Sequence, residues 1–215
     1  MLWLIQLILA LAVGKTGTVE GKVTVHKKDG SDKGDHSDVV VYVADVAEPV
    51  ALPPVEIRQR GRQFAPRVTA IAAGTNVAFP NDDLLEHNVF SHSANAEFDL
   101  GRFGPGPGKR QTFDKVGVAE IFCNIHKEMV SYIVVAPSSL FAVTGPDGSF
   151  SIKGLAPGRH TLVLWERFAR PRAVERTIEI TASGTTQVSF EVREQLDGEL
   201  PHKNKFGVAY TPLYR

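Results

Sequence analysis

The sequence of 215 residues has a single cysteine, Cys123, and no excess of charge of either sign, because 24 Lys and Arg balance 24 Asp and Glu. A lone cysteine excludes a disulfide within the chain. Balanced charge removes the global field that would attract nucleic acid or an acidic membrane surface, so we expect no nucleic-acid partner. Long helical periodicity of apolar residues is also missing, and this excludes a helical bundle.

The first residues, "MLWLIQLILALA", are almost wholly apolar, too short to span a bilayer, and end in a small-x-small pattern. We interpret residues 1–13 as a signal peptide, although no Lys or Arg precedes the apolar run. An uncleaved anchor or a buried first strand is the alternative. Export predicts a periplasmic or secreted protein with no membrane contact beyond that signal. A free thiol there must be buried, paired with another chain or bound to metal.

Past residue 13, apolar and polar residues alternate in short runs such as "KVTVH", "VVVYV", "AEIFC", "HTLVLW" and "QVSFEV". Turn signals such as "KDGSDKGD", "GPGPGK" and "GPDGS" separate these runs. The pattern predicts an all-β protein. The runs are too many for one small sandwich, so two packed β-sandwich units are expected.

The stretch "VTGPDGSFSIKGLAPGRHTLVLWE" resembles the carboxypeptidase regulatory-like, transthyretin-like sandwich family, in which an Asp-Gly turn precedes a strand and a Pro-Gly turn follows it. The opening strands of that family are similar to "VEGKVTV" and "SDVVVYV", which lie far upstream. The resemblance therefore implies a discontinuous sandwich over 18–47 plus 138–195. A second β-sandwich over 54–136 would be inserted in it or lie beside it, and 196–215 would form an extended or loosely docked tail.

The segment "FCNIHKEM" supplies a thiolate, an imidazole and a thioether from one short loop, at Cys123, His126 and Met129. A blue-type copper site needs two imidazoles and a thiolate in a plane, with a weak thioether on the axis. The best source of the second imidazole is His87, in the polar stretch "DDLLEHNVFSH". His92 in the same stretch is the rival.

Residues 54–136 resemble a cupredoxin, the family of plastocyanin and amicyanin, through the "FPN" strand end, "HNV" and the Cys-x-x-His-x-x-Met loop. The resemblance implies a Greek-key β-sandwich binding one type 1 copper ion. His87 and His126 would be imidazole ligands, Cys123 the thiolate and Met129 the axial thioether. The side chain of Asn88 would tie the two ligand loops together. The chain departs from the family at Ile125, where proline often precedes the second histidine.

The stretches "HNVFS", "FDLG" and "CNIH" together are similar to the plastocyanin-like proteins of bacteria labelled methylamine utilisation proteins. The resemblance implies an electron carrier that exchanges single electrons with a redox protein of unknown identity. Four filled coordination positions leave no open site for a substrate, so we expect no enzyme activity. A module for copper delivery or storage, and a structural sandwich without metal, are the competing hypotheses.

Simpler interpretations apply to several of these residues. Cys123 alone would be interpreted as a small buried apolar residue. With a histidine nearby it could also be a nucleophile, but the sequence shows no oxyanion loop or orienting acid. Zinc also accepts a thiolate and two imidazoles, and Met129 favours copper because a thioether is a soft ligand. The basic stretch "RQRGR" at 58–62 is expected to be a solvated sheet edge.

Overall fold

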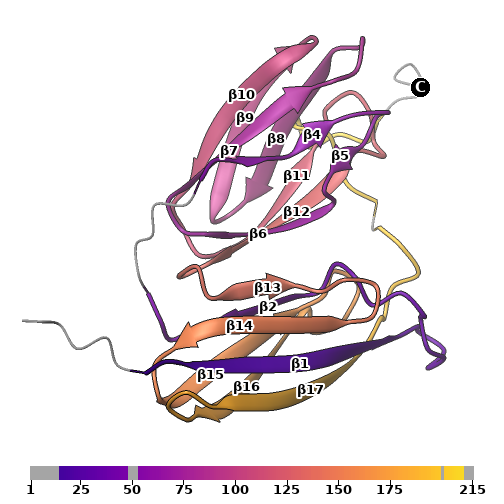
Figure 1. Ribbon diagram of the computed structural model, residues 1–215. Helices are drawn as coiled ribbons and strands as arrows, with labels where there is room; N and C mark the ends of the chain where they lie inside the picture. The colour runs from indigo at the N-terminus through magenta and orange to yellow at the C-terminus, as the bar shows by residue number, and fades with distance from the viewer. Residues whose placement is uncertain (1–14, 48–52, 200, 211–215) are drawn as a thin grey trace, which may run out of the picture.

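The computed structural model describes residues 15–47, 53–199 and 201–210, and these residues form strands and loops without a helix (Figure 1). The predicted all-β fold class is confirmed. The predicted signal peptide at 1–13 lies outside the described residues. Within them, no helix has the length and apolarity needed to cross a membrane.

The lower sandwich in Figure 1 joins strands from both ends of the described chain. One sheet has the order β14-β1-β17 and contains β1 Gly17–His26, β14 Ser149–Leu155 and β17 Thr185–Arg193. The other has the order β13-β2-β15-β16 and contains β2 Val40–Val43, β13 Phe141–Val143, β15 Gly158–Trp165 and β16 Ala173–Ile180. The early strands β1 and β2 therefore pair with strands that follow residue 140.

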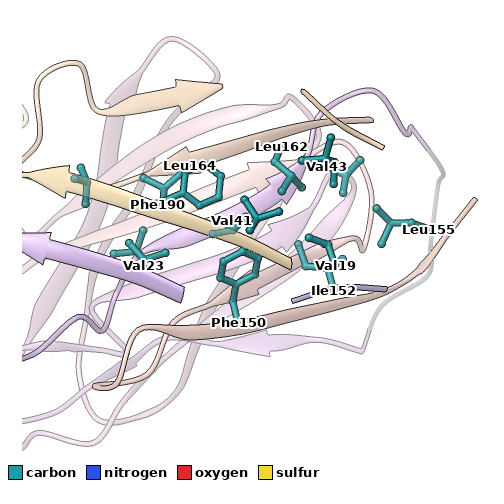
Figure 2. Close-up of a cluster of buried hydrophobic side chains, with 14 of the residues drawn as sticks. Val19, Val23, Val41, Val43, Phe150, Ile152, Leu155, Leu162, Leu164 and Phe190 are labelled. Atoms are coloured by element: carbon teal, nitrogen blue, oxygen red, sulfur yellow. The ribbon is translucent and has the colours of Figure 1, made fainter. Parts of the chain in front are cut away.

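The core of this lower sandwich fills the space between its two sheets (Figure 2). Alternate residues of β1, including Val19 and Val23, point inward and meet Phe150 and Ile152 of β14. Side chains of β2 and β15 approach from the facing sheet. The period of two in the sequence is the signature of strands with one face against this core.

The upper sandwich is built from the middle of the chain. One sheet has the order β10-β7-β4-β5, with β3 also paired to β7, and contains β3 Val55–Glu56, β4 Arg58–Gln59, β5 Phe64–Ala65, β7 Thr75–Asn81 and β10 Gly106–Phe113. The other has the order β6-β12-β11-β8-β9 and contains β6 Val68–Ala72, β8 His87–Ser93, β9 Ala96–Phe103, β11 Gly117–Phe122 and β12 Val130–Ala136. Cys123 and Met129 lie in the core between these two sheets.

A third apolar layer joins the two sandwiches. Tyr132 and Val134 of β12 face away from the upper core and pack with Val40 of β2 and Trp165 of β15. The Tyr132 and Trp165 rings lie 5.4 Å apart between centroids. Strand β12 is consequently buried on both faces, which explains its nearly continuous apolar run "YIVV". The four sheets therefore stack with apolar side chains in every gap, and separate folding of 54–136 from 18–47 plus 138–195 stays a prediction.

After β17 the C-terminal segment, drawn in yellow, runs along the side of the molecule to the upper sandwich (Figure 1). Its described residues, up to Tyr210, form no strand. These residues nevertheless form hydrogen bonds with the upper sandwich, for example from Lys205 to Asn124 and from Tyr210 to Cys123.

Candidate metal centre

Three side chains expected to bind metal meet at one end of the upper sandwich. His87 begins β8, whereas Cys123 and His126 lie in the loop between β11 and β12. Their potential ligand atoms all lie within 4.8 Å of one another. The two Nδ1 atoms of His87 and His126 are 3.1 Å apart, and the Cys123 Sγ is 3.8 Å from the His126 Nδ1.

These separations fit a single metal ion. In proteins, imidazole nitrogen lies about 2.0–2.1 Å and thiolate sulfur about 2.3 Å from a bound metal. With such bond lengths, the observed separations correspond to angles at the metal of roughly 100° between the two nitrogens and roughly 120° between sulfur and the His126 nitrogen. Both angles lie in the range of tetrahedral to trigonal sites. These two separations are therefore compatible with one metal ion bound between His126 and its two partners.

The backbone of the ligand loop folds back on itself. The Met129 N–H donates to the His126 carbonyl at 3.1 Å, and the Met129 carbonyl accepts from the Cys123 N–H at 3.3 Å. Met129 is fully buried in the same core cluster as Cys123. The loop thus returns its thioether residue to the neighbourhood of the thiol, and the role of Met129 as an axial ligand stays a prediction.

A carboxylate holds the other side of the first imidazole. Asp83 Oδ2 lies 2.8 Å from His87 Nε2, and the His87 side chain is fully buried. A carboxylate next to a ring nitrogen selects the tautomer with the proton on that nitrogen, so Nε2 donates to Asp83. The lone pair of His87 is then on Nδ1, which faces His126 and Cys123. Metal-ligating histidines commonly donate their second nitrogen to a carboxylate in this way.

Asp83 is itself fixed by a tight turn between β4 and β5. Gly61 and Arg62 both have positive φ, at 62° and 57°, as expected at the two central positions of a type I′ hairpin turn. Their N–H groups donate to the Asp83 carboxylate at 2.6 and 2.9 Å. Burial pushes the pKa of Asp83 upward, but these bonds and the His87 ring outweigh it, so the pKa lies below its usual value. The carboxylate is therefore held ionised beside the imidazole.

Asn81, at the end of the "FPN" strand β7, shapes the loop that presents Asp83. Its Oδ1 accepts from the Asp83 N–H at 3.0 Å, and its Nδ2 donates to the Leu85 carbonyl at 2.8 Å. Asn81 is 2% exposed, so these bonds are shielded from water. The turn at 61–62, the loop at 82–86 and His87 consequently form one hydrogen-bonded unit.

Asn88 connects the two segments that carry the candidate ligands. Its Oδ1 accepts from the Asn124 N–H at 3.3 Å, and its Nδ2 donates to Asp99 Oδ1 at 2.7 Å. The Asn88 side chain is fully buried. It therefore links the residue after Cys123 to strand β9, while its own backbone directly follows His87.

The thiol and the second imidazole lie in a poorly solvated environment. Burial raises the pKa of the Cys123 thiol, although N–H groups of Asn88 and Ile125 act in the opposite direction. Burial, followed by the neighbouring His87, lowers the pKa of His126. A neutral imidazole retains the lone pair that a metal needs. His126 is 7% exposed, whereas His87 and Cys123 are completely buried, so the cluster reaches the surface through His126.

The turn within residues 58–62 and the role of Asp83 were not recognisable from the sequence. The basic stretch at 58–62 is not simply a solvated edge, because it contains buried Gln59 and the turn that holds Asp83. The signal that could have indicated Asp83 is its position four residues before His87 and two residues after the end of β7. His92 lies outside the cluster with its side chain 53% exposed.

Similar solved structures include a purple cupredoxin from Nitrosopumilus maritimus, which is 23% identical over 38% of this chain and 99% of that chain at a TM-score of 0.35. A copper-containing nitrite reductase from Thermus scotoductus SA-01 is 30% identical over 44% of this chain and 25% of that chain at a TM-score of 0.37. A reduced mutant of amicyanin is 17% identical over 44% of this chain and 97% of that chain at a TM-score of 0.37. Each of these three matches covers less than half of this chain, and the chain spans a quarter of the nitrite reductase.

No protein-family model and no curated protein matches the chain. The three similar structures do not test the transthyretin-like resemblance of 18–47 plus 138–195, which stays a prediction. What can be said of the site rests on its own geometry, namely three convergent donors, a carboxylate behind one imidazole and a folded-back loop ending in Met129.

Proposed function

We propose that the protein binds one copper ion at His87, Cys123 and His126, with Met129 as a weak axial ligand, and carries single electrons between redox partners. The observation that carries the proposal is the convergence of two imidazole nitrogens and one thiol sulfur within 4.8 Å. Two imidazoles and a thiolate are the equatorial donors of blue-copper electron-transfer sites. Bound copper would supply the one-electron chemistry.

The donor set favours copper over zinc. A structural zinc site uses four strong ligands, and a catalytic zinc site keeps an open position for water. The fourth candidate here is a methionine, whose thioether is suited to soft metals. Met129 is fully buried in the apolar core of the upper sandwich, where an open water position has little polar support.

The surrounding residues supply rigidity and a route to the surface. His87 is fixed through Asp83, and Asn88 bonds to the backbone beside Cys123. A rigid ligand set changes little between two oxidation states, so little reorganisation opposes electron transfer. His126 alone among the three clustered side chains has exposed surface, and we assign it as the edge through which electrons enter and leave. The proposed site has no free coordination position, so we expect no substrate turnover.

The visible spectrum of the copper(II)-loaded protein tests this proposal. A strong thiolate-to-copper charge-transfer band and reversible voltammetry are expected for an electron carrier. Binding of copper(I) without a blue copper(II) form would instead indicate the alternative function, copper delivery or storage. Absence of stoichiometric copper binding would refute both functions. The protein should be loaded under reducing conditions first, because Cys123 is the single thiol and must remain unoxidised.

A further inference from the structure

The C-terminal residues 201–210, here called the strap, lie directly against the ligand loop. The Tyr210 hydroxyl donates to the carbonyl oxygen of Cys123 at 2.7 Å. The His202 Nε2 is 2.7 Å from the Lys127 carbonyl oxygen, and the His202 ring stacks on Phe122 with centroids 4.3 Å apart. The strap therefore contacts the ligand loop at both ends of the Cys123-to-His126 stretch.

Lys205 of the strap closes a ring of hydrogen bonds around the two ligand segments. Its N–H donates to Asn124 Oδ1 at 3.0 Å, and its Nζ donates to Asp99 Oδ2 at 2.6 Å. Asp99 Oδ1 accepts from Asn88, and Asn88 Oδ1 accepts from the Asn124 N–H, which completes the ring. The neighbours of both Cys123 and His87 are thus tied to one residue of the strap.

Hydrogen bonds and the stacking of His202 on Phe122, rather than burial of Phe206 and Val208, define the position of the strap. Its apolar side chains Phe206 and Val208 are 72% and 57% exposed. A segment held only to cover an apolar surface would turn such residues inward. The strap instead directs a hydroxyl, an imidazole and an amide at backbone and side-chain groups of the ligand segments. This selectivity points to a role in ordering the loop.

We propose that the strap is an integral part of the metal centre, with Lys205 and Tyr210 as positioning residues that hold the ligand loop in its metal-binding arrangement. The proposal rests on the copper function proposed above. The strap fixes the Cys123 carbonyl and the Asn124 side chain, which reduces the freedom of the loop both with and without metal. Its consequences are slow release of copper and a single, well-defined copper–thiolate geometry.

The test compares Lys205→Met and Tyr210→Phe in the full chain. Each removes one polar contact and keeps most of the apolar volume. Lys203→Met is the matched control, because Lys203 is exposed and its side-chain nitrogen has no hydrogen bond or ion pair with a described residue. Lys205→Arg is the rescue variant, since it retains a positive charge opposite Asp99.

Amide hydrogen exchange of the metal-free protein gives the first measurement. We expect exchange in the ligand loop to rise about tenfold in Lys205→Met and Tyr210→Phe, as the loss of one ordinary hydrogen bond allows. Exchange in β1 and β17 of the lower sandwich should be unchanged, which separates loop ordering from global destabilisation. Equal loop exchange in Lys205→Met, Tyr210→Phe and Lys203→Met would overturn the proposal.

Copper release to a chelator and the thiolate-to-copper band give the second measurement. Release should be about 10- to 100-fold faster in Lys205→Met, as is usual when groups that orient metal ligands are removed. The band should also shift or broaden, and Lys205→Arg should restore both properties. Release and band unchanged from wild type would overturn the proposal. If the wild-type protein forms no copper site, the proposed function fails. Amide hydrogen exchange in the ligand loop then tests by itself whether the strap orders that loop.

Discussion

Asp83→Asn removes the charge behind His87 while keeping the side-chain shape. In the wild type, Asp83 Oδ1 accepts from the Gly61 N–H at 2.6 Å. Oδ2 accepts from the Arg62 N–H at 2.9 Å and faces His87 Nε2 at 2.8 Å. An asparagine can keep its oxygen at the Oδ2 position and so preserve the last two contacts. Its NH₂ group then meets the Gly61 N–H, and two donors face each other.

The expected effect follows from that one lost contact. A hydrogen bond to a charged group contributes about 1.5–3 kcal/mol, so the metal-free variant should be less stable by about that amount. The Asp83 side chain is 15% exposed, and water therefore compensates little. The His87 ring also loses a charged acceptor, so copper affinity should fall about 10- to 100-fold. Removing negative charge next to the site should raise the reduction potential, because copper(II) carries more charge than copper(I).

Asp82→Asn is the matched control for this substitution. Asp82 precedes Asp83 and pairs with Arg58 at the surface, at 2.6 Å, without contacting His87. Urea unfolding of the metal-free proteins and competition titration with a copper chelator give the two comparisons. Equal stability and equal copper affinity in the two variants would refute the role assigned to Asp83.

Three further predictions address the ligands and the layer between the sandwiches. Cys123→Ser should abolish the blue colour and preserve the β-sheet circular dichroism, because the colour arises from the copper–thiolate bond; a blue variant would exclude Cys123 as ligand. Met129→Leu should keep copper and colour with a raised potential in voltammetry, since losing a weak axial donor destabilises copper(II) more than copper(I); complete loss of copper would show a stronger role. Trp165→Ala should destabilise the protein by about 3–5 kcal/mol in urea, because its ring is 3% exposed in the shared layer. When the copper-loaded Trp165→Ala protein unfolds in urea, the colour and the β-sheet signal should be lost together. Two separate transitions would contradict coupled unfolding of the two sandwiches.

Local patterns in the sequence were sufficient for the fold class and for the residues that cluster. Alternation in stretches such as "QVSFEV" reflects strands with one face in a core, as β17 shows. The spacing from Cys123 to Met129 encodes a loop that folds back through its own backbone bonds. In both regions the order of residue types within the stretch itself reflects the local conformation, so the pattern alone was informative.

The missed features depend on contacts between distant segments. Asp83 accepts hydrogen bonds from the N–H groups of residues 61 and 62, which lie 22 and 21 positions earlier. Lys205 meets Asp99 across 106 positions, and the described residues of the strap have no periodicity because they pair with no strand. Neither relation leaves a repeating signal in one sequence. The basic stretch at 58–62 is exposed at four of its five positions, as expected for a sheet edge, and its further role was missed because its backbone, rather than its charge, holds the carboxylate.

The central apolar layer gives the lower sandwich a part in the geometry of the site. Strand β12 follows Met129 directly, and its residues alternate between the upper core and the layer shared with β2 and β15. The lower sandwich therefore buries the far face of the strand that ends the ligand loop. Excising 54–136 would expose that face to water, including Tyr132 and Val134. The same strand also meets the C-terminal segment, because the Tyr132 hydroxyl bonds to Glu199. The candidate metal centre is thus supported in three ways: the hairpin turn holds Asp83 behind His87, the strap contacts the ligand loop, and the lower sandwich packs against β12.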